Sequence, residues 1–199
     1  MESVKIAGAG TIQSGEYDEV KISGSGRIVG DVTCNEFKGA GSVTIEKSLT
    51  AKEFKCSGAV KIEGKLKVKE GKISGAGKIL GDVEAEKLEI HGSLVVEGDI
   101  NAEEFIGKLG SGSFNNIYGE TIMINTKGDF IGGYFHDVIT NVRINEIEAT
   151  TICLKDVKAK RVSGENVVVE SGCIIDVVEY SNKLDISSKA EVKKIILSL

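Results

Sequence analysis

The two histidines are the side chains best suited to acid–base chemistry near neutral pH. His91 stands beside Gly92, and His136 directly precedes Asp137. A general base needs a reacting group within hydrogen-bond reach, and the sequence shows no convergent nucleophile–base or metal-ligand constellation around either histidine. We interpret His91 as a surface residue and keep the pair His136–Asp137 for one mutational test.

Glycine-rich and acidic motifs do not indicate catalysis either. Gly24–Gly30 and Gly75–Gly81 superficially resemble nucleotide-binding loops, but such loops open a helix, and here another strand pattern follows. Asp31, Asp82 and Asp99 each follow a glycine, as in sharp turns, and are dispersed rather than convergent. We therefore predict a protein that is not an enzyme and binds no cofactor or metal.

The four cysteines indicate buried thiols. Cys34, Cys56 and Cys173 occupy positions expected to point into a core, whereas the pattern does not assign Cys153. No pair has metal-ligand spacing, and free buried cysteines act as small hydrophobic residues in a reducing compartment.

The positions of these residues follow from a unit of 17 residues that is written five times between Val20 and Glu104. In register, the units are VKISGSGRIVGDVTCNE, FKGAGSVTIEKSLTAKE, FKCSGAVKIEGKLKVKE, GKISGAGKILGDVEAEK and LEIHGSLVVEGDINAEE. A fixed period of this length is typical of a solenoid.

Apolar residues recur in the unit at positions 1 and 3, 7 and 9, and 13 and 15. A spacing of two is the strand period, so each pair predicts a short strand with two side chains directed inward. Glycine, Asp and Asn between the pairs predict sharp corners. Three strands and three corners make a triangular coil, and coils stacked about 4.8 Å apart form an all-β, single-stranded parallel β-helix.

The pattern extends beyond the five units in both directions. Residues 4–19 form a shortened first unit, which completes a regular region over 4–104, and repeats resume with tighter coils over 142–199. Residues 105–141 lack a clear register and are predicted to be irregular. We expect one continuous β-helix over 1–199, with a break near 106–140 into two stacked sub-domains as the alternative.

Composition excludes several classes of protein. The 199 residues carry a net charge of −5 and have a pI near 5.3, which does not favour nucleic-acid binding. No apolar run approaches the roughly 18 residues of a membrane span, and the N-terminus does not resemble a signal peptide. We therefore expect a cytoplasmic protein without transmembrane insertion.

Two surface features are candidates for contact with a partner. The first is a row of lysines at position 2 of successive units: Lys5, Lys21, Lys38, Lys55 and Lys72. Glutamates two residues earlier are expected to offset the repulsion along it, and a solvated, charge-balanced face is the favoured interpretation. The second is a group of aromatic residues: Phe114, Tyr118, Phe130, Tyr134 and Phe135. These are an interface or, as we favour, a local core under a loop.

The recurring phrase Gly-Asp-Val/Ile, seen at Gly30–Val32, Gly81–Val83 and Gly98–Ile100, resembles the bactofilins, as do the surrounding I-x-G-S/A-G-x-I motifs. Bactofilins are bacterial polymer-forming cytoskeletal proteins with a right-handed parallel β-helix core and no catalytic residues. The resemblance, which covers residues 20–104, implies assembly without nucleotide into filaments by end-to-end stacking. It also implies a membrane-proximal location and partners among cell-envelope or membrane-associated proteins.

The leading hypothesis is a structural protein that self-associates through the ends of its β-helix. An uncapped terminal coil presents unpaired backbone groups and an open core, so Val4 and Ile6 at one end, and Ile195 and Leu197 at the other, are candidate contacts. The alternative is a monomeric or dimeric binding scaffold with capped ends. Such a scaffold would recruit its partner through the lysine row or the aromatic residues.

Overall fold

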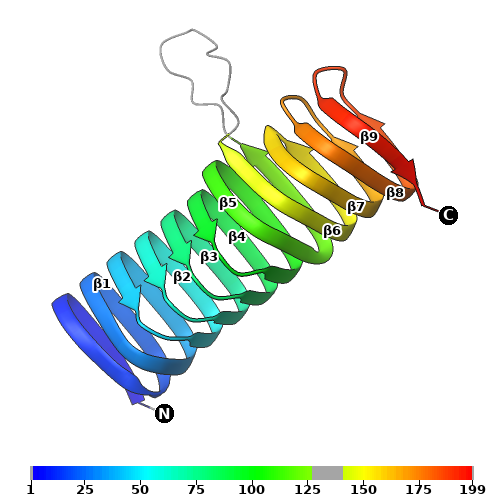
Figure 1. Cartoon of the computed structure of the whole chain (residues 1–199). Coiled ribbons are helices and arrows are strands. Elements are labelled where there is room, and N and C mark those ends of the chain that lie inside the picture. The colour runs from blue at the N-terminus through cyan, green and yellow to red at the C-terminus, as the bar shows by residue number, and fades with distance from the viewer. Residues whose placement is uncertain (1, 127–140, 199) are drawn as a thin grey trace, which may run out of the picture.

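The computed structural model describes residues 2–126 and 141–198, and in these residues every regular element is a β-strand. The strands are β1 (Glu2–Ile45), β2 (Leu49–Ile62), β3 (Leu66–Ile79), β4 (Val83–Val96), β5 (Ile100–Thr126), β6 (Val142–Lys155), β7 (Val157–Val169), β8 (Ile174–Ile186) and β9 (Glu191–Leu197). They form one nine-stranded sheet in sequence order, and every neighbouring pair is parallel. The sheet winds into a rod with the two termini at opposite ends (Figure 1). The predicted parallel β-helix is confirmed.

Successive coils of the N-terminal half pair residue for residue at an interval of 17. Val32 pairs with Leu49, and Leu49 pairs with Leu66. The same interval continues through Val83 to Ile100. Each inward side chain therefore stacks on the equivalent residue of the coil before it. A single strand bends around more than one face of the coil, which is why β1 extends over 44 residues.

The centre of the rod is filled by columns of apolar side chains. One column consists of buried residues throughout: Ile28, Ile45, Ile62, Ile79 and Val96. In another, the rings of Phe37 and Phe54 stack with centroids 5.3 Å apart. Gly71 follows them in that column, and a Cβ added there would lie 2.8 Å from Leu88 Cδ1 of the next coil. Large side chains thus occupy the space that small residues leave.

One corner of the coil is closed by a column of glycines, as the repeat predicts. Gly24, Gly41, Gly58, Gly75 and Gly92 have φ between +115 and +137°. A Cβ added at any of them would collide with the carbonyl oxygen of the glycine in the preceding coil. The left-handed backbone and the close approach both exclude a side chain, so this corner requires glycine.

The residues 105–126, for which the sequence pattern showed no clear register, continue the coil. Phe105 and Ile122 are buried, and Ile117 pairs with Ile147 of β6. The pattern is hard to see because the pairing shifts between Gly92 and Ser93 by one residue. Residues 127–140 of the predicted irregular segment lie outside the described residues.

Coil length changes after β5 while the inward columns stay aligned. Val142 pairs with Val157 at an interval of 15, Lys158 pairs with Ile174 at 16, and Ile174 pairs with Glu191 at 17. The predicted inward pairs in this region are buried or partly buried: Ile147/Ala149, Ile152/Leu154, Val157/Ala159 and Val162/Gly164. Residues are therefore lost and regained at the corners, where the backbone is not held to the strand period.

The glycine column can be tested with two matched substitutions. Gly8→Ala places a Cβ at φ +100° in open space, so it should cost only the left-handed strain of about 1–2 kcal/mol. Gly58→Ala adds a collision with the Gly41 carbonyl oxygen, and we expect a loss of roughly 3 kcal/mol or more. Thermal unfolding followed by circular dichroism compares the two, and equal losses would contradict the proposed role of the column.

Candidate assembly surfaces

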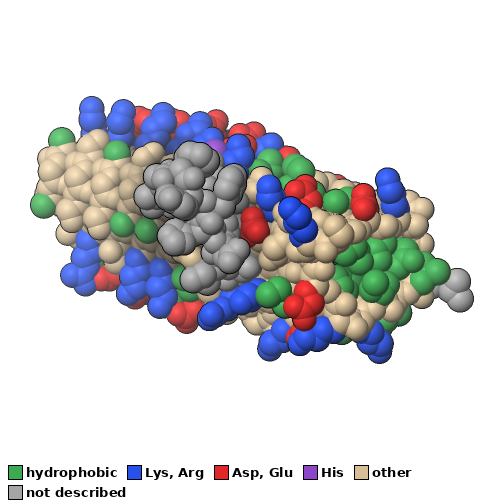
Figure 2. Space-filling view, turned by 90° about the horizontal axis from the view of Figure 1, so that it is seen from above, with side chains coloured by type: hydrophobic (Ala, Val, Ile, Leu, Met, Phe, Trp, Pro, Cys, Tyr) green, Lys and Arg blue, Asp and Glu red, His purple; other side chains and the backbone are tan. Residues whose placement is uncertain are grey.

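The C-terminal end of the rod presents an open core. Ile195 and Leu197 of β9 are 51% and 55% exposed, and Leu184 and Ile186 beneath them are only partly buried. Figure 2 shows hydrophobic side chains gathered at this end of the molecule. β9 pairs only with β8, so its outer edge has no strand partner within the described chain.

The N-terminal end is open in the same way. Val4 and Ile6 occupy inward positions of the first coil but are only partly buried. Val20 and Ile22, which hold the same positions one coil later, are fully buried. The difference arises because a coil stacks on both sides of Val20 and Ile22, whereas no described residue covers the outer side of the first coil. All four predicted end residues therefore lie at the tips of the rod.

The two ends differ in charge. Residues 2–19 carry more acidic than basic groups: Glu2, Glu16, Asp18 and Glu19 against Lys5. Residues 184–198 carry more basic than acidic groups: Lys189, Lys193 and Lys194 against Asp185 and Glu191. The first end is therefore negative and the second positive.

The lysine row forms one line along the rod, and most of it is compensated by carboxylates. Lys38 Nζ lies 2.6 Å from Glu36 Oε1, and Lys55 Nζ lies 2.8 Å from Glu53 Oε2, as expected. Lys72 departs from the expectation: it pairs with Glu89 of the next coil, at 2.9 Å, rather than with Glu70. Lys5 and Lys21 have no ion pair with any described residue.

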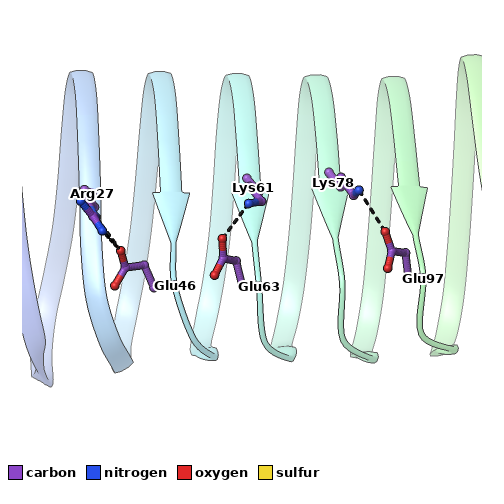
Figure 3. A network of polar contacts seen from close by, with 6 residues as sticks. All are labelled: Arg27, Glu46, Lys61, Glu63, Lys78 and Glu97. Carbon is purple, nitrogen blue, oxygen red and sulfur yellow. Dashed lines mark hydrogen bonds and ion pairs between the residues drawn. The ribbon is translucent and has the colours of Figure 1, made fainter.

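A second face carries a similar arrangement that our sequence analysis missed. Arg27 contacts Glu46, Lys61 Nζ lies 2.6 Å from Glu63 Oε1, and Lys78 Nζ lies 2.9 Å from Glu97 Oε1 (Figure 3). The signal was present, because the basic residues share unit position 8 and the glutamates share position 10. Each exposed pair contributes little stability, but the charges keep this face solvated.

Polar side chains also form a ladder at the corner after position 9. Asp99 Oδ1 accepts hydrogen bonds from the side chains of Asn115 and Asn116, at 2.8 and 3.0 Å. Asn145 Nδ2 then donates to Asn116 Oδ1 at 3.1 Å. This ladder crosses the point at which the coils become shorter, so it holds the corner in place there.

The aromatic residues do not form one exposed group. Phe114 belongs to the core, where it packs edge-on against Phe105 with ring centroids 6.0 Å apart, so it is not available to a partner. Tyr118 lies on the outside of the coil and is half-buried, and its pKa is raised by this burial and by nearby carboxylates. Phe130, Tyr134 and Phe135 lie outside the described residues, as do His136 and Asp137.

The cysteines divide as the repeat predicted. Cys34, Cys56 and Cys173 are buried, and burial raises the pKa of each thiol to about 11. Cys153, which the pattern left unassigned, points outward and is half-buried. His91 is half-buried at the glycine corner. In residues 2–126 and 141–198 no group of three or more His, Cys, Asp and Glu side chains is placed to hold a metal ion.

The chain matches no protein-family model, no curated protein and no solved structure. Within the described part of the chain, no helix is long and apolar enough to cross a membrane.

The Lys72–Glu89 pair should make the rod sensitive to acid. The hydrogen bond from Lys72 lowers the pKa of Glu89, so its contribution is present above the ordinary glutamate pKa and is lost as pH falls through the lowered value. We expect Lys72→Met to reduce stability at pH 7 by well under 1 kcal/mol, because the pair is exposed. Urea unfolding measured between about pH 7 and pH 3 should show this difference disappearing at the acid end.

Lys21→Met is the control, because Lys21 occupies the same column without an ion pair among the described residues. A pH-dependent loss of the same size in both variants would contradict the assignment to Glu89.

Proposed function

We propose that this protein is a structural scaffold that assembles end to end into filaments, in the manner of the bactofilins whose motifs its repeats resemble. The observation that carries the proposal is the open core at both tips of the rod. A monomer that exposes Ile195 and Leu197 together with an unpaired strand edge has the features that promote further strand pairing.

The coil geometry provides a contact without any change in shape. If the columns continue across a junction, Val4 stacks on Leu184 and Ile6 stacks on Ile186, at the spacing of about 4.8 Å found inside the rod. Each large side chain that becomes fully buried contributes at most about 1.5–3 kcal/mol. Several such side chains at each junction, with new backbone hydrogen bonds, are enough to offset an association cost of roughly 4–15 kcal/mol.

The charges of the ends favour head-to-tail assembly. Contact between two N-terminal ends would bring Glu16, Asp18 and Glu19 against their own copies. Contact between opposite ends instead brings these carboxylates toward Lys189, Lys193 and Lys194. A heterologous contact of this kind, repeated along one axis, gives an open polymer with a direction. No step of this assembly requires a nucleotide.

A second candidate function is a binding scaffold that does not polymerise. A surface depression of about 550 Å³ lies between Tyr118 and Tyr180. Its walls include Glu148, Glu165 and Glu179. In this alternative a partner binds along the outside of the later coils, and the ends are covered.

Substitutions at the ends separate the two candidates. We expect Ile6→Glu and Leu197→Lys each to abolish filaments, because each places a charge in the junction core, where an unpaired charge costs several kcal/mol. Val95→Lys, at a 38% exposed position on a lateral face, should leave assembly intact. Negative-stain electron microscopy and sedimentation velocity, both without nucleotide, measure assembly, and circular dichroism verifies the fold.

Mixing the two end variants tests the direction of assembly. In head-to-tail contact, each variant alone stays free of end contacts, whereas an equimolar mixture forms a dimer through the two intact ends. In contact between like ends, each variant alone forms a dimer. Filaments that persist in both variants would overturn the end-contact proposal and leave the binding scaffold as the better explanation.

A further inference from the structure

The outward column that carries the lysine row becomes apolar in the second half of the rod. Glu89 pairs with Ile106, and Ile106 is followed at successive coils by Met123, Cys153 and Val168. Val168 then pairs with Asp185, where charge returns. Four neighbouring outward positions therefore hold apolar side chains, and we call Ile106, Met123, Cys153 and Val168 the apolar stripe.

The apolar stripe is accessible in the described structure. Met123 is 40% exposed, and Ile106, Cys153 and Val168 are half-buried although their side chains point away from the core. Neighbouring coils lie about 4.8 Å apart, so the apolar stripe is roughly 14 Å long. The same column carries only charged residues in the preceding coils. A continuous apolar surface on a face that is otherwise charged indicates a contact surface.

We propose that the apolar stripe binds a second copy of this chain side by side, with the two rods antiparallel. A twofold axis between Met123 and Cys153 places Met123 opposite Cys153 of the second copy and Ile106 opposite Val168. This contact is self-complementary, as a twofold interface must be. Its orientation is selected by charge: parallel rods would bring the lysine row against its own copy, whereas antiparallel rods place the lysine row beyond the end of the partner.

The residues that flank the apolar stripe are complementary in the same arrangement. On one side Lys108 faces Glu170 of the second copy, and Asn125 faces Lys155. On the other side Thr121 faces Thr151, and Glu104 faces Asn166. Glu170 also lies near the apolar stripe within its own chain, with Oε1 3.7 Å from Cys153 Sγ. Each of these facing pairs has opposite charge or hydrogen-bonding capacity.

The contact ends where the charges cease to match. In the next row Lys87 would face Lys183, and Glu89 would face Asp185, which are like charges. Four rows of about 4.8 Å and a width of about 20 Å give roughly 400 Å² for each partner. This area is at the lower end for a specific interface, so we expect a dissociation constant on the order of 10–100 µM for isolated rods. Repetition along a filament would strengthen it greatly.

The inference goes beyond end-to-end assembly and does not depend on it. It is therefore tested in the double variant Ile6→Glu, Leu197→Lys, in which the ends are blocked. We expect this variant to show a reversible monomer–dimer equilibrium by sedimentation velocity. Adding Met123→Lys should raise the dissociation constant at least tenfold, whereas adding Val95→Lys on another face should not. A monomer at all concentrations up to several hundred micromolar, or a dimer insensitive to Met123→Lys, would overturn the inference while leaving the end contact to be judged by filament formation.

Orientation is tested by cross-linking single-cysteine variants with a short bismaleimide. Cys153→Ser is combined with either Ile106→Cys or Val168→Cys; the remaining thiols are buried. Antiparallel pairing predicts no cross-linked dimer from either variant alone, because equivalent positions are roughly 14 Å apart along the rod, and a strong cross-linked dimer from their mixture. Dimers from each variant alone would show parallel pairing and refute the proposed geometry.

A charge exchange provides rescue. Lys108→Glu and Glu170→Lys should each weaken the dimer, and the two substitutions together should restore it, because every facing pair is again of opposite sign. A double variant as weak as the single variants would contradict the facing of Lys108 and Glu170.

Discussion

The stacking of each coil on the one before it is the constraint on which the rest of this structure depends. Backbone hydrogen bonds between coils run along the rod, so a residue is fixed only when its equivalent lies directly above or below it. This explains why Leu88 fills the space above Gly71, and why the glycine corner tolerates no side chain. It also explains why coil length varies between 15 and 17 residues without loss of the columns, since the corners alone absorb the difference.

The same constraint divides the surface into regions with different roles. Lateral faces repeat every coil, so a single charged column becomes a long row, and its compensation by glutamates becomes a row as well. The tips interrupt the repetition and leave inward residues such as Leu197 without a neighbour. A rod of this kind has two surfaces at which apolar side chains meet water: the tips, and the few coils at which an outward column is apolar. Both kinds of surface support the proposals made here for self-association.

The regular coils could be predicted almost completely from the sequence, because inward and outward positions alternate at a constant interval of 17. Cys34 and Cys56 were assigned to the core on this basis alone. The prediction was least informative after Phe105, where a one-residue shift and shorter corners conceal the register. For this reason Phe114 was taken as a surface candidate, although it is buried, and Met123 was not recognised as an outward residue. The choice of Glu89 over Glu70 as the partner of Lys72 depends on side-chain reach between coils, which a linear pattern does not contain.

The direction of the hydrogen bonds has a mechanical consequence. Pulling on the two tips would load the bonds between coils along their own length, so a single coil boundary carries the whole tension at any moment. The rod would then open one coil at a time, beginning at its weakest boundary, rather than yielding as a unit. Bending is resisted differently, because the three faces of each coil are separated across the core and act as the flanges of a beam. The molecule is therefore built to be stiff against bending and compression, and to release under tension in steps of one coil.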